Sequence, residues 1–214
     1  MRSARVPDPS EFVEPPWDAP LDTGAVLSRI SESATIAGFY TEPLVREARR
    51  IGKLPSSARE RYIAFRFYPL REHVQMLIEC AGLMFPALPI RQGLRKLGRA
   101  APGALLQSTV GKVVFGSAEG ARQALDAIAR TYAINVRPSS AEVVDASPTS
   151  AIVRVRGAPF FLDSHHVGVF EGTMTFAGVR GSVKVRMLGM DDADFLCDWG
   201  EQPSGRGSAR PRRE

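Results

Sequence analysis

The spacing of apolar residues along the chain changes once, near Pro138. Before this point apolar residues recur every three or four positions, which is the period of an amphipathic helix. After it, apolar and polar residues alternate, as they do in strands that bury one face. Helices followed by strands are typical of an α+β fold.

In the first part, the clearest helix is expected to begin at Pro69, because proline suits the first helical turn. Its apolar stripe runs from Leu70 to Met84. Pro102-Gly103 is expected to interrupt the chain further along. Arginines recur every fourth residue before that break and predict one solvated helix face: Arg91, Arg95 and Arg99. Other helices are expected at Val26–Ile30, Phe39–Ile51, Ile90–Ala101, Ala104–Phe115 and from Ser117, as the N-cap, to Tyr132.

The second part predicts a hairpin, a helix and two further strands. These segments are Glu142–Ala146, Ala151–Arg156, Ser164–Ala177, Ser182–Leu188 and Asp194–Trp199. The chain is therefore expected to end in a strand–strand–helix–strand–strand unit. The N-terminal helices are expected to pack on a twisted, mostly antiparallel sheet.

Both ends of the chain differ in composition from the middle. Residues 1–22 hold five prolines and are expected to form a flexible arm, whose Phe12 and Trp17 dock either on the domain or on a partner. Residues 23–200 are expected to form a single domain. Residues 201–214 hold four arginines among Gly, Ser and Pro and are expected to be a disordered basic tail, which accounts for part of the net charge of +5.

Composition narrows the class of protein. The chain has two cysteines, and neither a secretory signal nor an apolar run long enough for a membrane helix is recognisable, so a cytoplasmic protein is expected. No pair of carboxylates has a spacing for acid–base work, and no nucleophile has an evident base. Residues 111–120 are rich in glycine but lack the Lys-Ser/Thr of a phosphate loop. We expect a protein that is not an enzyme.

Small residues form a stripe on the helix of the closing unit. Ser164, Gly168 and Gly172 are spaced four apart and therefore share one face. Each glycine costs a helix about 1 kcal/mol relative to alanine. A structural packing role is expected, most simply close approach to the sheet beneath.

Basic residues alternate with valines in two of the predicted strands. Arg154, Arg156, Lys184 and Arg186 point to the same side if the valines face the helices. If the two strands are neighbours, four positive charges line one face of the sheet. Such a face is either simply solvated or a docking surface for an acidic partner. Nucleic acid is disfavoured, because no aromatic residues interleave to stack on bases.

Several motifs together resemble a known family. They are Phe160–Ser164 with Val167–Gly172, Phe67–Glu72, Phe85–Pro89, Leu97–Arg99 and Thr109–Lys112, within Val26–Trp199. In order and spacing they resemble a family of unknown function that occurs as many paralogues in myxobacteria. That family is distantly similar to the 4-vinyl-reductase-type domain, the haem–nitric-oxide-binding domain and the TRAPP subunits. The shared ending is a Gly-x-x-x-Gly helix and a strand closing on an aromatic, matched by Gly168, Gly172 and Trp199.

The resemblance implies a binding module, because the similar domains bind small apolar molecules, haem or partner proteins. We expect a regulatory adaptor that acts through protein–protein contacts, as a homodimer. The alternative is a sensor whose pocket takes a small apolar ligand between the helices around Leu70–Met84 and the sheet.

No cofactor or metal is expected at the histidines and cysteines. His73 lies near Leu77, Cys80 and Met84, as a haem ligand would, but the Tyr-x-Ser-x-Arg-type clamp of the haem-binding relatives is not found. Adjacent helical residues point about 100° apart, so His165 and His166 do not readily share a metal, and an exposed or capping role is expected. Cys197 lies between Phe195 and Trp199 and is expected to be a buried structural thiol.

Overall fold

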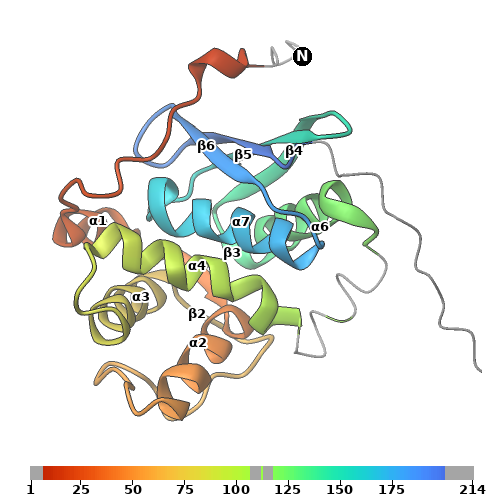
Figure 1. Cartoon of the computed structure of the whole chain (residues 1–214). Coiled ribbons are helices and arrows are strands. Elements are labelled where there is room, and N and C mark those ends of the chain that lie inside the picture. Colours follow the sequence, from red (N-terminus) through yellow and green to blue (C-terminus); the bar gives the residue numbers. More distant parts are fainter. Residues whose placement is uncertain (1–6, 107–111, 113–117, 201–214) are drawn as a thin grey trace, which may run out of the picture.

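The computed structural model describes residues 7–106, 112 and 118–200 (Figure 1). Within these ranges it has six α-helices and two antiparallel sheets, so the expected α+β class is confirmed. The α-helices are α1 (Thr23–Arg29), α2 (Gly38–Arg50), α3 (Leu70–Met84), α4 (Ile90–Leu106), α6 (Gly120–Asn135) and α7 (Val167–Phe176). The strands are β1 (Thr35–Ala37), β2 (Phe67–Pro69), β3 (Val136–Arg137), β4 (Ser140–Ala146), β5 (Ser150–Arg156), β6 (Ser182–Met187) and β7 (Ala193–Asp198).

The larger sheet has the order β4-β5-β7-β6, with every neighbouring pair antiparallel. Together with α7 it forms the predicted closing unit. Alternate residues of β5, β6 and β7 face inward, and Val153, Val185, Phe195 and Cys197 are buried in one core with Phe170 and Met174 of α7. This alternation follows from the period of two in the sequence.

The smaller sheet, β2-β1-β3, was not predicted. Its strands have two or three residues, which is too short for an alternating pattern to be recognised. Ile36 of β1 lies opposite both Tyr68 and Val136, so this sheet joins the start of α3 to the end of α6. The residues around it form a second core with α1, α2 and α3.

Helix α4 continues through Pro102, so the predicted break at Pro102-Gly103 is wrong. A proline inside a helix removes one backbone hydrogen bond. Here α4 lies along α7 and η2, and Pro102 itself is buried, so tertiary packing holds the helix in spite of that loss (Figure 1). The rest of the predicted helix Ala104–Phe115 beyond residue 106, apart from residue 112, lies outside the described residues, as do the predicted N-cap Ser117 and most of the motif Thr109–Lys112.

The glycine stripe packs on α4 and not on the sheet. A Cβ added at Gly168 would lie 2.1 Å from the carbonyl oxygen of Arg95, and one at Gly172 would lie 2.2 Å from that of Arg99. Gly98 of α4 contributes in the same way, because its Cβ would lie 2.1 Å from the carbonyl oxygen of His165. Three glycines on two helices therefore let the backbones touch.

The predicted solvated arginine face of α4 is instead an interface. Arg91 forms an ion pair with Asp163, and Arg95 forms one with the buried Glu171 of α7. Of the three arginines only Arg99 is exposed. The helical spacing correctly placed the three arginines on one face of α4. That face is an interface because Asp163 and Glu171 pair with two of the arginines.

The arm, from residue 7 onward, lies against the domain. Phe12 is buried, Val13 pairs with Val185 of β6, and the ring of Trp17 lies 4.0 Å from the guanidinium carbon of Arg95. These contacts favour the first of the two alternatives that the sequence left open for the arm. Among the helices in the described ranges, none is long and apolar enough to cross a membrane.

Candidate functional site

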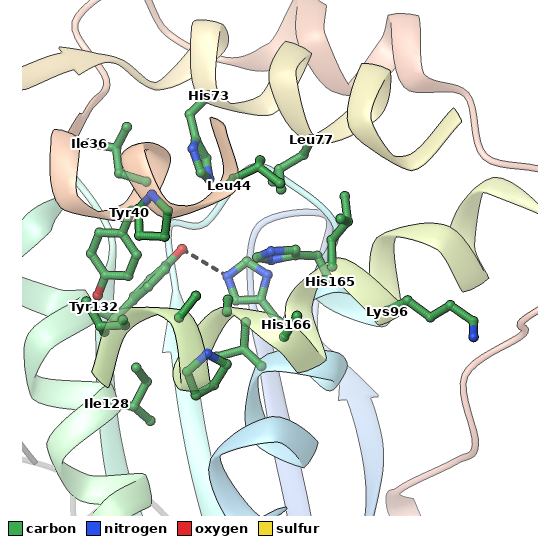
Figure 2. Close-up of a pocket in the computed structure, with 18 of the residues that line it drawn as sticks. Ile36, Tyr40, Leu44, His73, Leu77, Lys96, Ile128, Tyr132, His165 and His166 are labelled. Atoms are coloured by element: carbon green, nitrogen blue, oxygen red, sulfur yellow. Dashed lines mark hydrogen bonds between the residues drawn. The ribbon is translucent and has the colours of Figure 1, made fainter. Parts of the chain in front are cut away.

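A cavity of about 340 Å³ lies between α2, α3, α4, α6 and the segment that leads into α7 (Figure 2). The two sequence-distant halves of the chain meet there. Its wall is largely apolar, and the apolar side chains include Ile36, Phe39, Leu44, Leu77, Leu97, Ile128, Val155, Phe160 and Phe170. The residues between Leu70 and Met84, where the sequence placed the wall of a sensor pocket, contribute His73, Leu77 and Met84.

Three histidines, called here the pocket histidines, line the cavity: His73, His165 and His166. His73 Nδ1 lies 2.9 Å from the Thr41 hydroxyl. His166 Nε2 lies 3.0 Å from the Tyr132 hydroxyl, the contact drawn in Figure 2. His165 Nδ1 is buried and has no hydrogen-bond partner among the described residues.

A wide helical turn places two of these histidines. Residues Leu162–His166 form a π-helical turn, η2, in which the His166 N–H donates to the Phe161 carbonyl five residues earlier. Phe161 has a positive φ of 46°, an uncommon conformation for a residue other than glycine. Such π-turns frequently occur at functional sites. The exposed or capping role expected for His165 and His166 is wrong, because both side chains are buried.

Burial keeps the pocket histidines uncharged. Desolvation lowers the pKa of His73 to about 4, and the neighbouring His166 adds to the effect. Desolvation likewise lowers the pKa of His166 to about 4, and the pKa of His165 lies well below its usual value for the same reason. At neutral pH the inner wall therefore offers neutral rings.

Charged groups lie only at the rim of the described wall. Glu47 and Lys96 line the opening and are both exposed. Deeper in, the Tyr40 hydroxyl is buried and has no hydrogen-bond partner within the described part of the chain, and burial raises its pKa well above the usual value. The site thus combines an apolar, neutral interior with a charged mouth.

The predicted basic face exists but is not a free cationic surface. Strand β7 lies between β5 and β6, so the two basic strands are not neighbours. Asp194 of β7 has a fully buried side chain and accepts from Arg154 at 3.3 Å, from Arg156 at 2.7 Å and from Arg186 at 2.6 Å. Lys184 is exposed on the same face. The prediction of this face rested on the two basic strands alone, so it did not include Asp194, which lies on the strand between them.

The thiols and acidic groups give no metal centre within the described ranges, where no cluster of three or more suitable ligands occurs. Cys80 and Cys197 are both free and buried. Burial raises the pKa of Cys80 to about 12 and raises that of Cys197 as well, so both are protonated thiols. Cys197 thus lies in the core, as the sequence predicted.

Sequence reasoning missed Tyr40, Tyr132, His165 and His166 as lining residues. One signal was available for Tyr132. It ends an apolar helical stripe, and a buried tyrosine hydroxyl usually finds a hydrogen-bond partner, which here is His166.

Solved structures of H-NOX proteins share this fold. The Fe(II) unliganded H-NOX protein from K. algicida superposes with a TM-score of 0.61 at 11% identity, covering 80% of this chain and all of that one. An H-NOX protein from S. oneidensis in the Fe(II)NO state gives 0.60 at 11% identity, with 78% and 100% covered. A third, solved to probe heme distortion in the H-NOX family, gives 0.60 at 10% identity, with 81% and 100% covered. At these identities the likeness concerns the fold.

Residues 27–200 match the model of a family described as Protein of unknown function (DUF2378). A search of curated proteins finds no match.

The side chains of the cavity do not fit a haem, the group that the fold implies. A histidine is available, but haem also carries two ionised propionates, and a carboxylate that is buried without a cationic partner is costly. Lys96 is the one cation among the described lining residues, and Glu47 lies on the same rim.

Proposed function

The chain belongs to the DUF2378 family, and we propose that it is a sensor that binds one small, uncharged, largely apolar molecule in the cavity between helices and sheet. The observation that carries the proposal is the cavity itself, with its apolar wall and neutral histidines. Its volume of about 340 Å³ lies at the lower end of the range for small-molecule sites, roughly 300–1,000 Å³.

The interior selects against charge. Transfer of an ion into an apolar site without a partner costs several kcal/mol, and the inner wall holds no charged group among its described residues. A neutral ligand with one hydrogen-bonding group suits the pocket histidines better. At about −0.3 kcal/mol per atom, a ligand of roughly 20 non-hydrogen atoms binds with a Kd on the order of tens of µM.

A dye titration tests the proposal. Nile red, a neutral apolar fluorophore, is expected to bind the full chain with one-to-one stoichiometry and a rise in fluorescence. Ala101 lines the cavity, and Ala101→Phe is expected to fill it and weaken binding at least tenfold. Ala87→Phe adds the same ring at an exposed site outside the cavity and serves as the matched control.

If dye binding is equal in both variants, the dye binds elsewhere and the proposal fails. Circular dichroism spectra of the two variants show whether each keeps its fold.

The adaptor function expected from the sequence is a second proposal. In this proposal the protein acts in the cytoplasm by binding a separate protein partner or a second copy of the chain. Its expected surface, the basic face, is largely neutralised by Asp194. Support comes instead from the edge of β6, where extended backbone already docks.

A further inference from the structure

Strand β6 lies at one edge of the larger sheet, and none of its residues lines the cavity. Among the described strands β7 is its one neighbour. On its other side the Val13 N–H donates to the Val185 carbonyl at 3.0 Å, and the Val185 N–H donates to the Val13 carbonyl at 2.9 Å. Val185 therefore turns both backbone groups away from β7 and toward the arm.

The arm pairs with this edge at a single position. Alternate residues of an antiparallel strand direct their backbone groups to the same side, so Val183 and Met187 also face outward. Continued pairing would set Pro15 opposite Val183, and proline has no N–H to donate. It would set Glu11 opposite Met187, but the Glu11 N–H closes a 3-10 turn onto Asp8. The sequence of the arm therefore prevents backbone pairing with β6 on either side of Val13.

Side chains beside this backbone contact define a chemical preference. Arg186 forms an ion pair with Glu11, and its guanidinium carbon lies 5.9 Å from the centre of the Phe12 ring. Phe12 is only 5% exposed. Lys184, on the same face of β6, is exposed. The edge thus accommodates an acidic residue, here at the end of the 3-10 turn, followed by an aromatic residue in extended backbone.

We propose that the edge of β6 is a docking site for an extended acidic segment of a partner protein, which displaces the arm and adds a strand to the sheet. A segment without proline pairs at Val183, Val185 and Met187, where the arm makes two backbone hydrogen bonds at Val185 alone. Before a partner segment binds, the arm covers a sheet edge that would otherwise pair with other chains. The arm of a second copy would form no additional backbone hydrogen bond at Val183, because it carries the same Pro15.

Peptide binding to the full chain tests this docking site. The probe is a fluorescein-labelled peptide, Ser-Glu-Phe-Val-Glu-Val-Thr, which repeats Ser10–Glu14 and replaces the two prolines that follow. The control peptide keeps them: Ser-Glu-Phe-Val-Glu-Pro-Pro. Fluorescence anisotropy is expected to show at least fivefold tighter binding of the probe, since one net backbone hydrogen bond contributes about that factor.

Variants of the full chain locate the binding. Val13→Pro removes the donor of the arm and is expected to raise the affinity for the probe about fivefold. Lys184→Glu reverses an exposed charge on the edge. It is expected to lower the affinity for the probe several-fold at low salt, with little effect at high salt. Amide hydrogen exchange is expected to show new protection at Val183 and Met187 when the probe is bound.

Equal affinities for the two peptides, or no protection at Val183, overturn the proposal. A dimer of the full chain that Val13→Pro abolishes assigns the edge to a second copy, and also overturns it. Neither result bears on the cavity, because Val13, Lys184 and Val185 do not line it.

Discussion

Replacement of Gly168 by alanine is expected to destabilise the protein, although the same change normally stabilises a helix. The added Cβ would lie 2.1 Å from the Arg95 carbonyl oxygen, 0.9 Å short of the 3.0 Å that real Cβ atoms keep. The neighbour is backbone, so α4 and α7 must separate. Overpacking of this kind costs about 1–3 kcal/mol, and the better helix propensity of alanine returns up to about 1 kcal/mol.

Gly82 in α3 offers a matched control. It is exposed, and a Cβ added there meets nothing within 4 Å. Gly82→Ala is therefore expected to raise the free energy of unfolding by up to about 1 kcal/mol. Urea unfolding of the three proteins, followed by circular dichroism, measures both effects.

The two substitutions are expected to change the free energy of unfolding in opposite directions. A Gly168→Ala protein as stable as the Gly82→Ala protein would refute the close contact between α4 and α7. Because both helices also line the cavity, Gly168→Ala is further expected to weaken Nile red binding, whereas Gly82→Ala leaves it unchanged.

Three further predictions concern charge. The pKa values of His73 and His166, about 4 in the folded state, lie below the unfolded value of about 6.5, so their contribution to stability is complete above that pH and is lost as pH falls toward 4. Urea unfolding at pH 7.5 and pH 5 is expected to show a loss of about 2 kcal/mol for each, and a flat profile would contradict their burial. Asp194→Asn is expected to cost about 2–4 kcal/mol, because three arginines lose their shared carboxylate, whereas Glu142→Gln on an exposed contact changes little. Full chain supplied with haem is expected to show no Soret band of bound haem.

The closing unit could be predicted because its residues follow a simple period. The valines of β6 alternate with polar residues, and in the structure Val183 and Val185 are buried while Ser182 and Lys184, before and between them, are exposed. Gly168 and Gly172 were correctly assigned to packing, but the packing partner was not. A one-dimensional pattern reports a face of a helix, and which element covers that face depends on tertiary contacts.

The cavity could be placed only roughly from the sequence. The helix Leu70–Met84 was expected to form one wall, and it supplies His73 and Leu77. The π-turn η2 could not be foreseen, because its sequence resembles an ordinary helix start. His165 and His166 both belong to this turn and line the cavity.

Pro102 shows the opposite error. Proline is a strong local signal for a break, yet the helix that contains it packs along α7 and stays intact. Tertiary packing overrode local propensity there.

The central claim, that the cavity binds a neutral apolar molecule, is tested most directly with a matched pair of ligands. Isothermal titration of the full chain with 1-naphthylmethanol and with 1-naphthoate compares the same ring with and without a charge. Binding of one alcohol per chain, at least about tenfold tighter than the carboxylate and lost in Ala101→Phe, is the predicted result. Equal or tighter binding of the carboxylate, or binding that Ala101→Phe leaves intact, would contradict the account.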